Sequence, residues 1–226
     1  MFASHFAVGF AAKRYAPQVS LGTLFLGAQF IDLLWPTFLL LGIEDVRIEP
    51  GATATTPLVF THYPWSHSLL AVLAWATLLG LAFRWLRGST RGAVVLGLAV
   101  VSHWLLDLVV HAPDLPLHPG DSPLFGLGLW DWRIPALLLE LSLLAIGVAL
   151  YARLTRHLDA TGRFGFIALV CMLVLIQVAN AFGAPPPGKQ AVAWVGQAQW
   201  LLVLWGYWID RHRRAKSAHA GPMAST

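Results

Sequence analysis

The chain has 226 residues, of which 57% are hydrophobic and 12% are charged, and its mean hydropathy is +0.65. Soluble domains carry about 25% charged residues. The composition therefore excludes a soluble globular domain and indicates an integral membrane protein.

Hydropathy along the chain predicts one short helix followed by six membrane-spanning helices. Residues 1–12 are apolar but too short to cross a bilayer, which predicts a re-entrant or interfacial N-terminal helix. Longer apolar segments follow at about residues 19–42, 66–86, 92–111, 133–152, 164–183 and 192–209. We therefore expect an all-α helical bundle that forms a single transmembrane domain over residues 1–209. Residues 210–226 are predicted to be a basic, disordered cytoplasmic tail.

The basic residues orient the predicted bundle. Of the 15 lysines and arginines, only Arg47, Arg133 and Lys189 fall on the face opposite the chain termini. The positive-inside rule then predicts that both termini are cytoplasmic, in the inner membrane of a bacterial cell. The net charge of +4 reflects this orientation. The expected partner is the lipid bilayer, and no nucleic-acid partner is expected.

Several ionisable residues lie inside the predicted spans, where each costs about 2.5–3.5 kcal/mol on insertion scales. They are Asp32 in the first span, His67 at the start of the second, His103, Asp107 and His111 in the third, and Glu140 in the fourth. Residues four apart share a helix face, so the three in the third span form one polar stripe. With His62 and Asp32, these groups are expected to gather in the outer half of the bilayer.

Histidine nitrogens and carboxylate oxygens are the usual ligands of zinc and similar divalent ions. A bound ion would also compensate buried carboxylates that otherwise stay unpaired. A divalent metal site within residues 1–140 is therefore the favoured interpretation, with zinc as the expected ion and manganese as the alternative. A plain hydrogen bond between His103 and Asp107 is the competing interpretation. Three serines, Ser66, Ser68 and Ser102, are expected to donate hydrogen bonds around the ligands or to cap helices.

Four segments, in this order, resemble the bacterial membrane-bound metal-dependent hydrolases. They are an early histidine, His5, then Asp32 in GAQFIDLLWP, His62 through Ser68 in HYPWSHS, and Ser102 through Asp107 in SHWLLD. That family is distantly similar to zinc-dependent phospholipase C and the single-strand-specific zinc nucleases. The resemblance covers about residues 1–115. It implies that Asp32, His62, His103 and Asp107 are metal ligands, with His5, His67 and His111 as further candidates.

The resemblance implies hydrolysis of a lipid headgroup or another membrane-associated phosphoester through a water that the metal activates. His67, His111 or Glu140 would carry the proton. Glu140 is also a candidate ligand or a polar contact between helices. Two other classes of function stay open. One is a transporter or channel in which the polar stripe relays protons or passes a metal ion. The other is a non-catalytic membrane protein that a metal stabilises.

Overall fold

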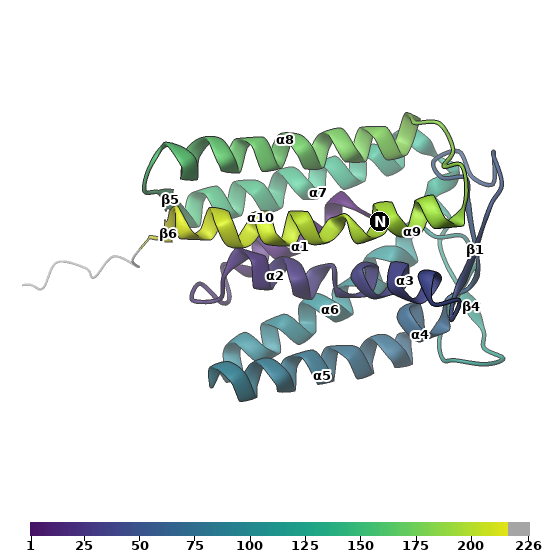
Figure 1. Cartoon of the computed structure of the whole chain (residues 1–226), viewed down its shortest axis with the longest axis horizontal. Helices are drawn as coiled ribbons and strands as arrows, with labels where there is room; N and C mark the ends of the chain where they lie inside the picture. The colour runs from purple at the N-terminus through teal and green to yellow at the C-terminus, as the bar shows by residue number, and fades with distance from the viewer. Residues whose placement is uncertain (217–226) are drawn as a thin grey trace, which may run out of the picture.

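The computed structural model describes residues 1–216, and helices make up most of them (Figure 1). Within this part of the chain, four helices are long and apolar enough to cross a membrane. They are α5 (Leu69–Arg87), α6 (Thr90–Val110), α7 (Arg133–Leu154) and α8 (Ala160–Phe182). These helices coincide with the second to fifth predicted spans. Three of them begin at a capping side chain: Ser68 for α5, Ser89 for α6 and Asp159 for α8.

The first predicted span is not one straight helix. The segment 19–42 forms α2 (Leu21–Ala28) and α3 (Phe30–Leu40), and these two helices meet at an angle of 58°. The bend lies at Gln29, whose φ of −99° and ψ of 4° leave the helical region. If the bent pair counts as one span, up to five segments could cross a membrane.

The last predicted span is also divided. It forms α9 (Lys189–Gln197) and α10 (Gln199–Arg211), and neither meets the length and hydropathy expected of a spanning helix. The six-span expectation is therefore met only in part. The first residues of the predicted disordered tail are ordered: α10 continues to Arg211, and β6 (Arg213–Ala215) pairs with β5 (Thr155–His157). Residues 217–226 of the predicted tail lie outside the described residues.

The N-terminal helix, α1 (Ala3–Ala12), lies inside the bundle. It packs against α7, α2 and α6, and the side chains of His5, Phe6 and Phe10 are fully buried. This burial excludes the interfacial alternative, because an interfacial helix needs one face in the lipid headgroups. Met1 also lies inside the bundle, where its amine donates a hydrogen bond to Asp107.

The connections at one end of the bundle fold into small hairpins (Figure 1). An antiparallel pair joins β1 (Asp45–Ile48) to β2 (Leu58–His62), and a second joins β3 (Leu115–Pro116) to β4 (Leu124–Phe125). The 3₁₀-helix η1 (Leu129–Asp131) precedes α7, and the short helix α4 (Pro64–His67) follows β2 directly. Lys189 at the start of α9 donates to the Asp45 carboxylate at 2.5 Å. That bond ties the first hairpin to the last pair of helices.

Candidate metal centre

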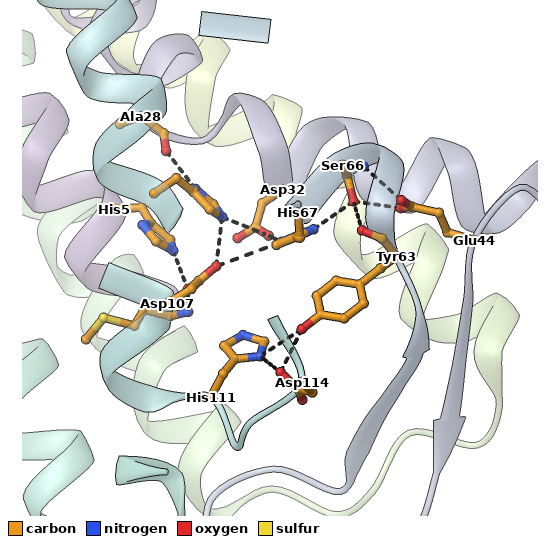
Figure 2. Close-up of polar contacts among 12 residues, drawn as sticks. His5, Ala28, Asp32, Glu44, Tyr63, Ser66, His67, Asp107, His111 and Asp114 are labelled. Carbon is orange, nitrogen blue, oxygen red and sulfur yellow. Dashed lines mark hydrogen bonds and ion pairs between the residues drawn. The ribbon is translucent and has the colours of Figure 1, made fainter. Parts of the chain in front are cut away.

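Two overlapping groups of three side chains bring potential metal ligands together. His5, His103 and Asp107 form one group, and Asp32, His67 and His103 form the other. Within each group the ligand atoms all lie within 4.8 Å of one another. The residues come from α1, α3, α4 and α6, so segments far apart in the sequence converge on one point (Figure 2). All except Asp32, which is partly exposed, are buried.

The spacing of these atoms matches what one metal ion requires. The Nε2 atom of His103 lies 3.2 Å from Asp107 Oδ2 and 3.5 Å from Asp32 Oδ1. The Nε2 atom of His67 lies 3.6 Å from Asp32 Oδ1 and 3.8 Å from Asp107 Oδ2. Ligands held about 2.0–2.1 Å from a tetrahedral zinc ion lie roughly 3.3–3.4 Å from one another. The observed separations bracket this value.

The hydrogen bond on the far side of the His103 ring fixes its tautomer. Its Nδ1 lies 3.0 Å from the carbonyl oxygen of Ala28, which can only accept a hydrogen bond. Nδ1 therefore carries a proton. Nε2 is buried and faces the carboxylates of Asp107 and Asp32, at 3.2 and 3.5 Å. In the neutral ring this nitrogen carries a lone pair, which faces two acidic side chains.

A longer chain of hydrogen bonds fixes the His67 ring in the same way. The Glu44 carboxylate accepts from the Ser66 hydroxyl at 2.7 Å, and its other oxygen accepts from the backbone N–H groups of Trp65 and Ser66. Because the single hydroxyl proton of Ser66 points to Glu44, the Ser66 oxygen accepts from His67 Nδ1 at 2.7 Å. The lone pair of His67 Nε2 then faces Asp32 and Asp107. Such outer partners are typical of metal-ligating histidines.

His5 completes the cluster from the buried N-terminal helix. Its Nε2 atom lies 3.2 Å from Asp107 Oδ1. Its ring stacks on that of His103, with 3.7 Å between ring centres and an interplanar angle of 8°. Asp107, only 1% exposed, therefore contacts the two imidazoles and the amine of Met1. Leaving such a carboxylate unpaired in the interior would be costly.

The structure does not bring three of the predicted site residues into this cluster. His62 is exposed on β2, opposite Asp45 in the hairpin. His111 ends α6, and its Nδ1 lies 2.9 Å from Asp114 Oδ1. Glu140 on α7 accepts hydrogen bonds from the backbone N–H groups of Phe2 and Ala3 at the start of α1. Glu140 thus holds the helix that carries His5, and it lies beside the cluster without joining it.

The three predicted serines have three different surroundings. Ser66 links His67 to Glu44 as described. Ser68 accepts a hydrogen bond from the backbone N–H of Ala71 and caps α5. Ser102 donates to the Ala99 carbonyl oxygen of its own helix, and within residues 1–216 its side chain makes no hydrogen bond to the candidate ligands.

Sequence reasoning missed several groups that position the site. Glu44 appeared to be an ordinary loop acid, yet it is 1% exposed and anchors Ser66. The Ala28 carbonyl carries no side-chain signal. Tyr63 donates its hydroxyl proton to Asp114 at 2.7 Å. Burial and, next, the Asp114 carboxylate raise the pKa of this hydroxyl well above its ordinary value, so Tyr63 stays a donor. A serine directly before a histidine was the signal that could have prompted a search for Glu44.

The chain matches no protein-family model, no curated protein and no solved structure. The resemblance to membrane-bound metal-dependent hydrolases stays a prediction from the sequence.

Proposed function

We propose that this protein is a membrane-embedded metal-dependent hydrolase that acts on a lipid headgroup or another membrane-associated phosphoester. The observation that carries the proposal is the pair of tautomers at His103 and His67. Each ring is held by its Nδ1 proton so that its Nε2 lone pair points at the same two carboxylates. Lone pairs and carboxylates repel one another unless a cation lies between them.

The donor set fits a divalent metal. Asp32, His67 and His103 would hold the ion, with Asp107 and His5 as the adjoining ligands. Imidazole nitrogens with carboxylate oxygens suit zinc best, and manganese is the alternative ion. An ion at this position supplies Lewis-acid polarisation of a phosphoryl oxygen and lowers the pKa of a bound water.

The residues around the cluster supply positioning and proton transfer. Ala28 and the Ser66–Glu44 pair keep the ligand rings oriented. His111 and Glu140 line the same cavity as Asp32, His67 and Asp107 and are the candidate proton carriers. Asp114 holds the His111 ring from behind, which leaves the Nε2 atom of that ring free to exchange a proton.

The membrane arrangement belongs to the same proposal. Four helices could span the bilayer, the bent α2–α3 pair adds a fifth segment, and α9 with α10 would together form a sixth. The metal centre would lie in the outer half of an inner membrane, on the side of the hairpins. The charge distribution supports this orientation.

The test is metal content per chain, measured by inductively coupled plasma mass spectrometry on protein purified in detergent without chelators. We expect stoichiometric zinc or manganese in the wild type, and loss of the metal in His103→Ala and Asp107→Asn. His62→Ala is the matched control and should keep the metal, because His62 lies outside the cluster. A metal-free wild type after metal resupply would contradict the proposal and favour a proton shared between His103 and the carboxylates.

The hydrolase step needs a separate assay. The metal-loaded wild type is expected to release product from bis(p-nitrophenyl) phosphate or from phospholipids in mixed micelles, and Asp107→Asn is expected to be inactive. If the metal is present and Asp107→Asn only lowers the melting temperature, with no hydrolysis by the wild type, the ion serves stability alone.

A further inference from the structure

One cavity connects the metal centre to the outside of the bundle. Its volume is about 520 Å³, and three of the proposed metal ligands, Asp32, His67 and Asp107, line it. This volume falls within the range of 300–1,000 Å³ that is typical of small-molecule sites. A ligand in the cavity would therefore reach the proposed metal directly. The remaining walls indicate what kind of ligand fits.

Polar groups without partners lie in the cavity wall near the ligands. Trp35 lines the cavity and is only 8% exposed, and its indole N–H has no acceptor among residues 1–216. The side-chain carbonyl of Gln199, in the same wall, also has no donor in that part of the chain. Buried polar groups are almost always hydrogen-bonded. A ligand with oxygen atoms, such as a phosphate ester, would satisfy the indole N–H.

The cavity also holds a cation at its rim. Arg133 lines the cavity and carries a permanent positive charge. The guanidinium lies between the first hairpin and α8: its Nε donates to the Ala54 carbonyl oxygen at 2.5 Å, and its central carbon lies 5.5 Å from the Phe182 ring centre. A guanidinium has five N–H donors, and the bond to Ala54 uses one. The others can bind an anionic oxygen.

Beside Arg133 the wall of the cavity is apolar and exposed. Phe182 near the end of α8 and Val195 on α9 both line the cavity, and they are 55% and 72% exposed. Ala181 and Val192, which are less exposed, also line the cavity. Because α8 is one of the candidate membrane spans, exposed apolar residues on it would face lipid. The cavity thus runs from a polar metal centre to an apolar mouth.

We infer that the cavity binds an amphiphile, namely a phosphate ester that carries a long apolar chain. The phosphate lies toward Asp32, His67 and Asp107, and the indole N–H of Trp35 and the guanidinium of Arg133 are the donors in the cavity lining that would bind it. The apolar chain leaves past Val192, Val195 and Phe182 into the bilayer. This inference rests on the proposed function for the placement of the phosphate. It adds that the protein also recognises the apolar chain of the ligand. A soluble phosphoester has the same head but lacks the group that fits the mouth.

The test measures binding, so it does not depend on turnover. Metal-loaded protein in dodecyl maltoside is incubated with hexadecyl phosphate, butyl phosphate or inorganic phosphate, and bound ligand is quantified by native mass spectrometry. We expect the apparent Kd for hexadecyl phosphate to be at least tenfold lower than that for butyl phosphate. Arg133→Gln should weaken the binding of both esters about tenfold, because it removes the cation.

Two variants on the exposed faces of α9 and α10 test where the apolar chain of the ligand lies. Val195→Trp fills the mouth and should abolish the preference for hexadecyl phosphate while the metal content stays that of the wild type. Leu201→Trp adds the same bulk at a residue that is 65% exposed and outside the cavity lining, and it should keep the preference. Metal content also shows that each variant is folded.

The outcomes separate this inference from the proposed function. Equal affinity for the two esters, or an unchanged preference in Val195→Trp, would overturn the inference that the cavity binds an amphiphile. Hydrolysis of a soluble phosphoester would still be possible. A preference for hexadecyl phosphate that Val195→Trp abolishes supports the inference, even if no hydrolysis is detected. In that case the hydrolase proposal fails and the amphiphile site remains.

Discussion

Replacing Glu44 with glutamine should weaken metal binding although Glu44 itself is not a proposed ligand. The carboxylate accepts the Ser66 hydroxyl proton, and Ser66 therefore accepts from His67 Nδ1. In Glu44→Gln, the amide oxygen can still accept from the backbone N–H groups of Trp65 and Ser66. The amide nitrogen then faces Ser66 and donates to it. Ser66 turns its own proton toward His67, which moves the imidazole proton to Nε2, the ligand atom.

The magnitude follows from the hydrogen bonds that must be given up. For His67 to offer a lone pair at Nε2, the Ser66 oxygen must accept from both the new amide and His67 Nδ1. The buried Ser66 hydroxyl proton then has only the Tyr63 carbonyl oxygen as acceptor, at 3.4 Å. That costs about 1–3 kcal/mol, and each 1.4 kcal/mol is a factor of ten in an equilibrium constant. We therefore expect the Kd for zinc to rise roughly 5- to 150-fold. This agrees with the 10–100-fold loss typical of changes in the outer partners of metal ligands.

The assay is zinc affinity of the detergent-purified protein by competition with a chromophoric chelator. Glu49→Gln makes the same chemical change at a half-exposed residue of the same hairpin, where the partner is Arg47 at 3.6 Å. It should leave the Kd unchanged. Ser66→Ala should weaken binding to a similar extent as Glu44→Gln, because it removes the acceptor of His67 Nδ1. Wild-type affinity in Glu44→Gln, or an equal loss in Glu49→Gln, would refute the tautomer argument.

Three further predictions concern the surroundings of the site. Gly147→Ala should lower both the melting temperature and the metal content, because an added Cβ would lie 2.4 Å from the Ala7 carbonyl oxygen and displace α1; Gly188→Ala, with nothing within 4 Å, is the control. Asp159 accepts from His212, and this hydrogen bond lowers the pKa of the exposed Asp159 carboxyl. The stability it contributes is therefore present above the ordinary pKa of 3.8 and is lost as the pH falls below it. Asp159→Asn, which can still cap α8, should flatten the decline of the melting temperature at acidic pH, and parallel curves would contradict this. Tyr63→Phe should leave metal content unchanged while lowering the melting temperature, because its hydroxyl bonds to Asp114 and not to a ligand; loss of metal would show that the Tyr63 hydroxyl supports the site.

Hydropathy predicts the long helices well because each of them presents about 20 apolar residues in succession. It does not predict the bend at Gln29, since the segment 19–42 stays strongly apolar on average on both sides of Gln29 and its proline, Pro36, lies beyond the break. The bend matters to the site, because the carbonyl at the end of α2 is the acceptor that orients His103. A main-chain acceptor of this kind depends on the path of the backbone and leaves no trace in the order of side chains.

The site residues were predictable to different degrees for physical reasons. His103 and Asp107 are four apart on one helix, so a helical prediction already places them on one face. His62 and His67 stand in the same short motif, and the motif alone does not decide which of them turns inward. The chain changes from β2 to α4 between them, so His62 stays exposed in the hairpin and His67 becomes buried. The register of that hairpin pairs Asp45 with His62 and has an irregularity between Asp45 and Val46, which the motif does not indicate.

The same hydrogen bonds weigh against a proton relay through the cluster. A histidine relays protons by taking one at one ring nitrogen and releasing one from the other. At His103 the outer nitrogen is bonded to the Ala28 carbonyl oxygen, which cannot donate a proton back. At His67 the outer nitrogen is bonded to Ser66, whose own proton is directed to Glu44. In the neutral state both rings therefore keep their outer proton and offer a lone pair inward, which a metal ligand requires and a relay between the two ring nitrogens does not.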